Sequence, residues 1–538
     1  MSQTHAQKIA IVDATGSGKG RRRFTRDAIG AGPRSVYGVL EKLGVEAKIF
    51  LAEDILEKGF SKEFTALFVS AMSMDKIAVK RVITSWRKTS KGKVVVGGPI
   101  ASELEDSLLI TGADIIAIGE GENTIKELIE SKILLGTESI DRLGKILGIG
   151  YFNSSGEAKI NGFRQYSSRE EFRSFQASTK CITDYPNHFS AKVYVECARG
   201  CSNFGGTKLL LPDGRQCSNC GSCESYCLED RLDCPEGIPL GCGFCSVPNL
   251  FGPARSRSSE QVVKEITELL DKNVKRIILS APDFLDFGRD ETLGDNLLIN
   301  PYFPKANTKA IENLLSQITS IGSVAKGKAW IEVENIKAHL FTEEVARIIA
   351  KYLPGSSFSI GCETGSESHA KQLGRSSMPL DTLRAVKIAH KHGLRAHVYF
   401  IHSLPGQTKQ TAKETVKLIK DLEPYIEKIT IYRFRPLPMS AFGDVPPPQP
   451  AIKNPVSKMI ADAANTVNRK KKTSLVGKEV RVILSEPNYR EEGGAIAIIL
   501  DGGPMVAVAD AKERIGEIVT ISIDRVLSEK LVHGTIID

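Results

Sequence analysis

Residues 193–201 read VYVECARGC and residues 241–258 read GCGFCSVPNLFGPARSRS, and nine of the eleven cysteines lie between Cys197 and Arg257. About forty residues separate the two quoted segments. The run VYVE alternates apolar and polar residues, which predicts a strand, so the cysteines begin where a strand ends. We interpret this dense cysteine region as a metal-binding element around which the rest of the chain is organised.

The segment between the quoted stretches has its own cysteine pattern. Cys217, Cys220, Cys223 and Cys227 are separated by two, two and three residues, and Cys234 begins a Cys-Pro step. This spacing is typical of loops that bind a ferredoxin-type four-iron cluster. We predict an auxiliary [4Fe-4S] cluster on the first three of these cysteines, with Cys227 or Cys234 as the fourth ligand. A structural zinc ion is the main alternative, and a disulfide framework is a weaker one.

The composition is that of a globular protein of two to four domains. The chain has 538 residues, of which 41% are hydrophobic and 25% are charged, with a formal net charge of +8. This mild excess of positive charge only weakly favours anionic partners. The sequence has no apolar run of eighteen residues and begins with MSQTHAQKIAIVD, without the apolar region of a signal peptide. We therefore expect a cytoplasmic protein without a transmembrane segment.

Residues 1–165 form the first predicted domain. Short apolar runs alternate with helical patterns, which predicts an α/β fold with a doubly wound parallel sheet. Glycine-rich loops follow two of the strands, at the edge where open α/β sheets bind ligands. The strands are expected at 8–14, 45–52, 65–73, 93–98 and 114–122, and the helices at 35–44, 75–88 and 122–130.

Residues 166–455 form the second predicted domain. Strand and helix patterns alternate from VYVE to the strand KITIYRF, which predicts a partial (β/α)6 barrel with its active site at the carboxyl ends of the strands. A proline-rich segment, 446–450, ends it. Residues 456–538 begin with a linker that carries the basic run 469–472. Four short strands follow, expected at 477–486, 495–503, 504–510 and 516–527, which predicts a small all-β barrel.

The two quoted cysteine segments resemble one motif of the radical S-adenosylmethionine (radical SAM) superfamily. That motif is Cys-x3-Cys-x2-Cys, with Arg-Gly before the first cysteine and an aromatic residue before the third. The resemblance implies that Cys201, Cys242 and Cys245 bind three irons of a [4Fe-4S] cluster, whose fourth iron binds SAM. Unlike the family motif, this chain inserts residues 202–241 after the first cysteine, so the insertion must fold outward, and Cys197 remains the alternative first ligand.

The segment GCETGS also matches a family step, Gly-x-Glu-Ser-Gly-Ser, in which the carboxylate faces the ribose of SAM. The resemblance implies that Gly361, Glu363 and Ser366 lie beside the cofactor, as does Phe244 of the cysteine motif. An ion pair with a structural role is the alternative for Glu363. Three further carboxylates at neighbouring strand ends are expected near the sulfonium or the ribose: Asp283, Glu332 and Glu334. A surface position is the alternative for the two glutamates, because Ile331 and Val333 alternate with them.

The flanking domains also have family resemblances. The first is similar to the cobalamin-binding-type domain, including its GGP and GEGE steps. However, the loop after the first strand reads ATGSGKGRRR over residues 14–23, without the histidine that binds cobalt in many cobalamin proteins. Cobalamin bound without a histidine ligand and a scaffold without cofactor both stay open. The last domain resembles the TRAM domain, which binds tRNA in relatives of this enzyme class.

The resemblance implies a reaction class. A low-potential electron donor such as ferredoxin would supply one electron, SAM would be cleaved, and the 5′-deoxyadenosyl radical would take hydrogen from an unactivated carbon. We predict a transferase that forms a carbon–carbon bond or methylates its substrate, with RNA bound through the TRAM-like domain. Similar archaeal enzymes that close rings in tetraether lipids or methylate a protein make lipid and protein the alternative substrates. Methylthiotransferases hold their auxiliary cluster with amino-terminal cysteines, and this chain has none before Cys181.

Overall fold

The computed structural model describes residues 7–22, 25–135, 140–500, 502–528 and 530–537. The chain divides into two compact units. Unit 1 consists of residues 1–195 and 264–273, and unit 2 of residues 196–263 and 274–538. Residues 166–195, which the sequence analysis placed in the central domain, therefore pack with unit 1.

Unit 1 is built on a seven-stranded sheet with the order β3-β1-β4-β5-β6-β7-β8. The first five strands in this order are parallel, and β7 and β8 are added antiparallel at one edge. The predicted parallel sheet is thus confirmed. A shorter strand, β2 (Ala28–Ile29), pairs in parallel with β9 (Lys192–Glu196). The sheet strands are β1 (Lys8–Asp13), β3 (Glu46–Leu51), β4 (Ala66–Ser70), β5 (Val94–Gly97), β6 (Ile115–Ala117), β7 (Ile149–Phe152) and β8 (Ala158–Ile160).

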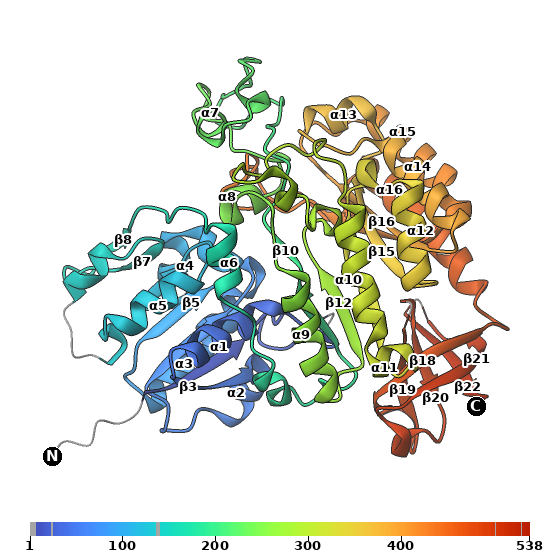
Figure 1. The fold of residues 1–538 in the computed structure, drawn as a ribbon, viewed down its shortest axis with the longest axis horizontal. Helices are drawn as coiled ribbons and strands as arrows, with labels where there is room; N and C mark the ends of the chain where they lie inside the picture. The colour runs from blue at the N-terminus through green and yellow to red at the C-terminus, as the bar shows by residue number, and fades with distance from the viewer. Residues whose placement is uncertain (1–6, 23–24, 136–139, 501, 529, 538) are drawn as a thin grey trace. The chain divides into compact units, whose positions relative to one another are not determined.

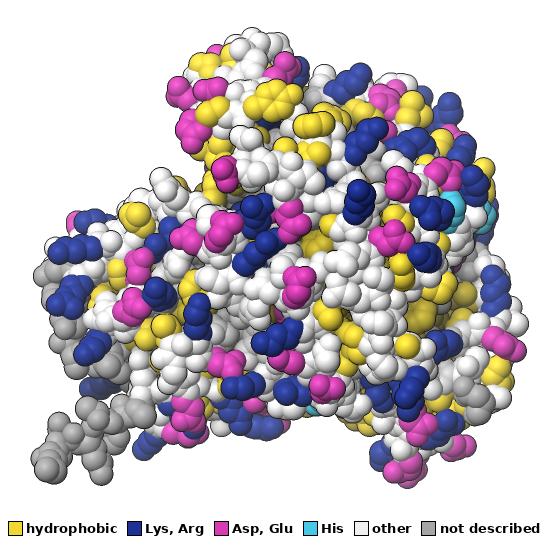
Figure 2. All heavy atoms as spheres, viewed as in Figure 1, with side chains coloured by type: hydrophobic (Ala, Val, Ile, Leu, Met, Phe, Trp, Pro, Cys, Tyr) yellow, Lys and Arg dark blue, Asp and Glu magenta, His cyan; other side chains and the backbone are white. Residues whose placement is uncertain are grey.

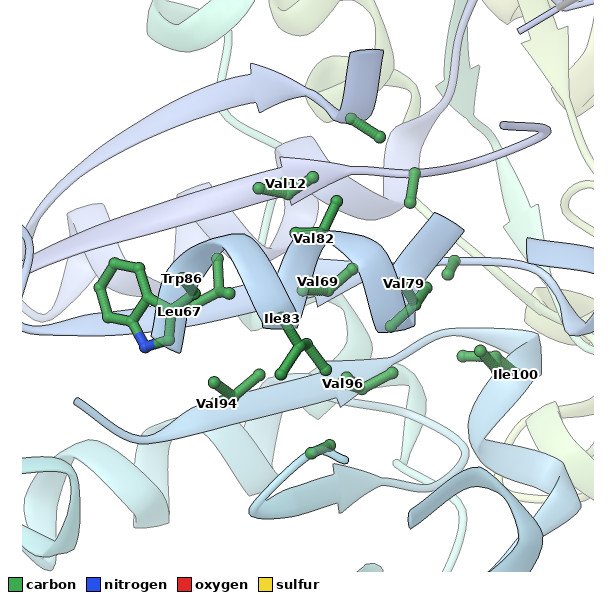
Figure 3. Close-up of a cluster of buried hydrophobic side chains, with 14 of the residues drawn as sticks. Val12, Leu67, Val69, Val79, Val82, Ile83, Trp86, Val94, Val96 and Ile100 are labelled. Carbon is green, nitrogen blue, oxygen red and sulfur yellow. The ribbon is translucent and has the colours of Figure 1, made fainter. Parts of the chain in front are cut away.

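The central strands of this sheet are apolar on both sides because helices cover them (Figure 1). In Figure 3, Val79, Val82, Ile83 and Trp86 of α3 pack against valines of β4 and β5. All of these helix side chains are buried, which gives the sheet a dense apolar core. The helices of the unit are α1 (Ala31–Lys42), α2 (Ala52–Lys58), α3 (Lys76–Thr89), α4 (Glu105–Thr111), α5 (Glu122–Glu130), α6 (Arg169–Ser174) and part of α9 (Ser259–Asp271).

One buried carboxylate fixes the loop that follows β1. The side chain of Asp75 accepts hydrogen bonds from the N–H groups of Gly16 at 2.9 Å, Gly18 at 2.7 Å and Met72 at 3.0 Å. Gly16 and Gly18 have φ angles of +72° and +54°, where glycine is not strained. The glycines of this loop therefore serve a defined turn, which the carboxylate holds at the end of the strand.

Unit 2 contains the βα repeats that the sequence predicts. β12 pairs with β13, and β14-β15-β16-β17 form a second parallel sheet. The helices follow the strands on the outer side (Figure 1). The strands are β10 (Ala198–Arg199), β11 (Arg255–Ser256), β12 (Arg276–Ser280), β13 (Trp330–Val333), β14 (Asn335–Ile336), β15 (Ser357–Glu363), β16 (Arg395–His402) and β17 (Ile426–Arg433), and the helices are α8 (Val247–Phe251), α10 (Thr308–Ser320), α11 (Gly322–Ala325), α12 (Glu343–Tyr352), α13 (Glu367–Gln372), α14 (Pro379–Lys391), α15 (Lys409–Leu422) and α16 (Pro455–Thr473).

The insertion 202–241 has little regular structure. Its main helix is the short α7 (Leu228–Leu232), and Figure 1 shows this segment projecting beyond α8 and α13 of the same unit. Leu209, Leu211 and Ile238, at the base of the insertion, pack in an apolar cluster with Leu373 and Phe442. The insertion therefore has an apolar base on the core of unit 2 and an exposed outer part.

The carboxyl-terminal segment forms a closed barrel with the order β18-β19-β20-β22-β21, which confirms the predicted small barrel. The sequence analysis missed two elements here. One is α16, which occupies the predicted linker, and the other is β22, which closes the barrel by pairing with β20 and β21. The barrel strands are β18 (Glu479–Pro487), β19 (Ala495–Ile499), β20 (Met505–Val508), β21 (Ile518–Val526) and β22 (Leu531–Ile536).

The anchoring role of Asp75 leads to a testable prediction. Asp75→Ala removes the acceptor of three backbone N–H groups, which we expect to cost roughly 2 kcal/mol of stability, because an unsatisfied amide costs about 1–3 kcal/mol when it is buried. Hydrogen exchange of residues 14–22 should become faster, and mass spectrometry of peptides from this loop measures it. Glu57→Ala, at an exposed position of α2, is the matched control and should leave the loop protected. Equal protection in both variants would contradict the anchoring role.

Candidate functional site

Backbone pairing brings the two ends of the cysteine region together. β10 pairs antiparallel with β11, so the chain before Cys201 runs beside the chain after Cys245. The N–H of Cys201 donates to the carbonyl of Gly252 at 3.0 Å. Gly200 has a φ angle of +82°, and a Cβ atom there would stand 2.2 Å from the carbonyl oxygen of Pro253. Only glycine fits at this crossing, which explains the Arg-Gly step before the first cysteine.

The insertion leaves and re-enters unit 2 through a narrow neck. Gly206 and Leu240 form an antiparallel bridge, and the N–H of Gly241 donates to the carbonyl of Gly205 at 2.5 Å. The neck ends directly before Cys242. An insertion of about forty residues therefore separates Cys201 from Cys242 in sequence without separating them in space.

The cysteines of the quoted motif share hydrogen-bonding partners. The backbone N–H of Asn203 donates to Cys201 Sγ at 3.3 Å, and its side-chain Nδ2 donates to Cys242 Sγ at 3.2 Å. The N–H of Cys245 donates to the carbonyl of Cys242 at 2.8 Å, which closes a turn between the last two cysteines. The structure therefore brings Cys201, Cys242 and Cys245 together.

These thiols also interact through their charges. Burial, together with Cys242 and Cys201, raises the pKa of Cys245 to about 12. Burial also raises the pKa of Cys201. Metal ligation needs thiolates, and bringing three thiolates together costs free energy unless cations compensate their charge. This donor set fits an iron–sulfur cluster, because the irons supply that compensation.

The spacing of the thiols bears on the kind of metal centre. Within the ranges that the structure describes, no three His, Cys, Asp or Glu side chains converge closely enough to hold a single metal ion. A single zinc ion holds four sulfurs at about 2.3 Å, so tetrahedral geometry places them only about 3.8 Å apart. A cubane binds each thiolate at a different iron and accommodates a wider spacing.

Arg375 lies beside Cys242 and connects it to Glu363. Its Nη1 is 3.8 Å from Cys242 Sγ and 3.7 Å from Glu363 Oε1, and its Nη2 donates to the carbonyl of Gly361. Although burial acts in the opposite direction, Cys242 and Glu363 raise the pKa of Arg375 above its usual range. The guanidinium is also 5.9 Å from the centre of the Phe244 ring. Arg375 therefore joins the cysteine motif to the end of β15.

A second cation lies on the side of Cys201. Lys337 Nζ donates to Ser202 Oγ at 2.6 Å and to Asp286 Oδ2 at 2.8 Å. Burial acts to lower the pKa of Lys337, but Asp286 and Cys201 raise it above its usual range. Arg289 completes this buried network through an ion pair with Asp286. The first thiol thus lies next to a charge network that is satisfied within the protein.

The predicted carboxylates occupy different environments. Asp283 is buried, its Oδ1 accepts from the N–H groups of Leu285 and Lys337, and burial followed by Asp286 raises its pKa. Its polar contacts therefore belong to the network behind Cys201. Two other carboxylates accept hydrogen bonds from serine hydroxyls on neighbouring strands. Ser357 donates to Glu332 at 2.7 Å, and Ser280 donates to Glu334 at 2.6 Å.

Glu363 has the most unusual geometry of the predicted carboxylates. It lies at the end of β15 with a φ angle of +66°, which strains a residue other than glycine. Burial raises the pKa of Glu363, and the nearby charge of Arg375 acts in the opposite direction. Ser366, by contrast, begins α13 and is 3.2 Å from Ser368, oxygen to oxygen. The positive φ angle distinguishes Glu363 from the other predicted carboxylates.

Two further cysteines, Cys197 and Cys362, are buried inside the protein. Cys197, the alternative first ligand, is fully buried, with its N–H bound to the carbonyl of Ser280 and its own carbonyl to the N–H of Arg257. Cys362 is buried, and its thiol donates to the carbonyl of Thr364 at 3.2 Å. Cys201 is therefore the first cysteine of the motif that interacts with Cys242 and Cys245.

The cysteines of the insertion form a second group. Burial raises the pKa of Cys223, and the next three contributions come from Cys234, Cys217 and Cys220. Cys227 lies at an exposed position, where its thiol donates to Glu229 Oε2 at 2.7 Å.

Sequence reasoning missed the polar side chains that surround the thiols of the motif. Their positions follow from the fold rather than from a motif, since Arg375 and Lys337 lie far from the cysteines in sequence. A strand-end position was the available signal for Lys337, which follows β14. The missed residues are Asn203, Asp286, Lys337 and Arg375.

Two observations concern the other expectations. The loop of residues 14–22, which Asp75 holds, contains no histidine that could bind cobalt. Among the described helices, none is both long enough and apolar enough to cross a membrane.

Comparisons with solved structures show the fold. The radical S-adenosylmethionine methyltransferase TsrM from Kitasatospora setae, solved with cobalamin and a [4Fe-4S] cluster, superposes with a TM-score of 0.56 over 81% of this chain and 74% of that chain, at 14% identity. The cobalamin-dependent S-adenosylmethionine radical enzyme OxsB gives a TM-score of 0.54 at 14% identity. The match covers 85% of this chain but about half, 55%, of the OxsB chain.

Comparisons of sequence give closer relatives. The uncharacterized protein MJ1620 of Methanocaldococcus jannaschii is 43% identical over 98% of both chains, and the uncharacterized protein MK0932 of Methanopyrus kandleri is 40% identical over 99% of this chain and 96% of its own. The ribosomal protein uS12 methylthiotransferase RimO of Clostridium botulinum is 24% identical over 74% of this chain and 70% of its own. The model of the radical SAM superfamily matches residues 234–419. The chain therefore belongs to the family of the two archaeal proteins and is a radical SAM enzyme.

Proposed function

We propose that this enzyme forms a carbon–carbon bond at an unactivated carbon, methylation included, and that Cys201, Cys242 and Cys245 hold its SAM-binding [4Fe-4S] cluster. The observation that carries the proposal is that Asn203 donates hydrogen bonds to both Cys201 and Cys242, with Cys245 in a turn after Cys242, although about forty residues lie between the first and the second cysteine. Three thiolates held close together repel one another, so this arrangement destabilises the protein unless a metal centre binds them.

The polar side chains around the thiols support the same assignment. When bound, the cluster and SAM supply the one-electron chemistry that removes hydrogen from an unactivated carbon. Three protein thiolates leave one iron for the amino and carboxylate groups of SAM. Arg375 and Lys337 stabilise the negative charge of the thiolates, and Arg375 also orients Glu363. Glu363 is then the acceptor for the ribose hydroxyls of SAM.

The substrate is expected on the side of β16 and β17. Tyr399 OH lies 2.7 Å from Ser359 Oγ, and its ring is 5.5 Å from the ring of Tyr432, which is 51% exposed. Burial raises the pKa of Tyr399, as do Glu334 and Glu363 to a lesser degree, so these groups share one polar region. A region of hydroxyls, carboxylates and half-exposed rings suits a polar substrate.

The choice of transferred group follows from two facts. TsrM is named a methyltransferase and RimO a methylthiotransferase, so both names support transfer of a carbon-containing group. This chain has no cysteine before Cys181 that could hold an amino-terminal auxiliary cluster. We therefore favour formation of a carbon–carbon bond, including methylation, over sulfur insertion. Cobalamin as methyl carrier would bind here without a histidine ligand.

Loss of one ligand tests the cluster assignment. Cys242→Ala should abolish SAM cleavage in the anaerobically reconstituted enzyme, because the cluster loses one of its three protein ligands. Chromatography of 5′-deoxyadenosine measures cleavage, and electron paramagnetic resonance (EPR) of the reduced enzyme should show a SAM-sensitive signal in the wild type but not in Cys242→Ala. Cys227→Ala, a cysteine bound to Glu229 in the insertion, is the matched control and should keep both. Cleavage at the wild-type rate in Cys242→Ala would refute the assignment.

Glu363 provides a second test. Glu363→Gln should weaken SAM binding roughly 10-fold or more, because a hydrogen bond to a charged group contributes about 1.5–3 kcal/mol. The concentration of SAM that half-saturates the change in the EPR signal measures this binding. Glu343→Gln, in a surface ion pair of α12, is the control and should bind SAM normally. Unchanged binding in Glu363→Gln would show that this carboxylate has only a structural role.

The proposed substrate is RNA, bound through the carboxyl-terminal barrel and the end of α16. Arg469, Lys470, Lys471 and Lys472 lie in the last part of α16, directly before the barrel. The barrel itself has acidic positions such as Glu486 and Glu491, and dark blue and magenta side chains are interspersed over the face in Figure 2. The basic helix end is therefore the part of this region with the charge that phosphates require.

Charge reversal at the helix end tests RNA binding. Arg469→Glu with Lys471→Glu should weaken binding of total tRNA about 10-fold or more and flatten the dependence of log Kd on log salt by about 2, one for each lost phosphate contact. Titration at several salt concentrations measures both quantities. Lys413→Glu with Lys417→Glu, on the exposed face of α15, makes the same change in charge and should preserve binding. Equal effects of the two double variants would exclude a specific role of α16, and product formation on lipid or protein alone would exclude RNA as substrate.

A further inference from the structure

The cysteines of the insertion fall into two environments. Cys223 interacts with Cys234, Cys217 and Cys220, whereas the thiol of Cys227 is bound to Glu229 at an exposed position. Sequence spacing alone left Cys227 and Cys234 as equal candidates for a fourth ligand. The fold separates them, because α7 lies between the two and carries the chain from one environment to the other.

The position of Cys234 is fixed from both sides. Its carbonyl accepts the N–H of Gly237 at 2.8 Å, and the carbonyl of Gly237 accepts from the guanidinium of Arg215. Cys234 also packs against the apolar cluster at the base of the insertion, which includes Leu211 and Phe442. Cys234 is thus held by the core of unit 2, whereas Cys227 lies on the outer part of the insertion.

The surroundings of this second group suit thiolates. The N–H of Asn219 donates to Cys217 Sγ at 3.4 Å, and Cys220 Sγ donates to Ser222 Oγ at 3.3 Å. Arg231 is buried, its Nε donates to the carbonyl of Ser225 at 2.5 Å, and its positive charge interacts with Cys223. This cation favours a thiolate at Cys223.

We infer that Cys217, Cys220, Cys223 and Cys234 hold a second [4Fe-4S] cluster in which every iron has a protein ligand, and that Cys227 is not a ligand. All eleven cysteines are free thiols, so no disulfide uses any of the four. None of these described cysteines belongs to a group of three that could close on a single metal ion. The ferredoxin-type sequence pattern favours a cubane over the tetrahedral zinc site that the sequence also allowed.

The neck places this cluster close to the first one. A Cβ atom at Gly206 would stand 3.6 Å from Cys223 Sγ, and Asn203, three residues earlier, donates to Cys242 Sγ at 3.2 Å. Three residues span at most about 11 Å, so one short piece of chain touches both groups of thiols.

Full protein ligation restricts what the second cluster does. Without an open iron it binds neither SAM nor a substrate group, and it lacks a free corner from which a sulfur atom is donated. The role that remains is one-electron transfer, in which the oxidised cluster accepts one electron from a low-potential donor and returns to its oxidised state by passing that electron on. This inference rests on the proposed function only for the identity of the first cluster.

The test uses the full-length protein, reconstituted anaerobically with iron and sulfide, in a background that lacks the first cluster. A variant with Cys201, Cys242 and Cys245 all changed to Ala should keep about four irons per chain, the content of one cubane. Adding Cys234→Ala should remove them, whereas adding Cys227→Ala should leave them in place. Colorimetric iron and sulfide assays give the counts, and EPR of the reduced background variant should not change when SAM is added.

A measurement on the unmodified protein covers the case in which a variant fails to fold. X-ray absorption at the iron and zinc edges should show iron–iron scattering and no zinc bound by four sulfurs. Zinc in the insertion, or loss of iron in Cys227→Ala but not in Cys234→Ala, would overturn the assignment. A SAM-dependent change in EPR of the background variant would show an open iron and would also overturn it. Because that variant lacks the first cluster, these results do not depend on whether the proposed function is correct.

Discussion

The pairing of β10 with β11 is the constraint on which the candidate site depends. It holds the chain before Cys201 beside the chain after Cys245, and Gly200 permits the close approach because a Cβ atom would collide with Pro253. The antiparallel bridge between Gly206 and Leu240 likewise holds the start and the end of the insertion together. Two layers of backbone pairing thus isolate the insertion, so its length does not alter the spacing of the thiols that flank it.

Charge is the second organising factor. Cys242 and Cys201 contribute, after burial, to the raised pKa of Cys245, and two cations, Arg375 and Lys337, lie near these thiols, each with its own carboxylate partner. Burial of ion pairs adds little stability by itself, because desolvation offsets the attraction. In the proposed function, the arrangement has its value in the reaction, where the cations would stabilise thiolates beside the strained backbone of Glu363.

The two groups of cysteines complement each other chemically. In the proposed assignment, three protein ligands at the first group would leave an iron for SAM, whereas four at the second would close that cluster to ligand exchange. Their proximity through residues 203–206 gives a reason for placing a second cysteine-rich segment inside the first motif rather than elsewhere in the chain. In the proposed function, the carboxyl-terminal barrel and the basic end of α16 form a separate surface for substrate binding.

The sequence by itself determined the parallel strands of the first sheet, the βα repeats and the small barrel, because apolar periodicity is a local signal. It did not predict β7 and β8, which join the first sheet antiparallel at one edge. It missed α16, where a proline-rich approach suggested a linker, and β22, whose short run has weak alternation. The choice between Cys227 and Cys234 and the positions of Asn203, Lys337 and Arg375 depended on the tertiary structure. These residues lie far apart along the chain, and only strand pairing and the packing of the insertion's base bring them to the thiols, which no local pattern encodes.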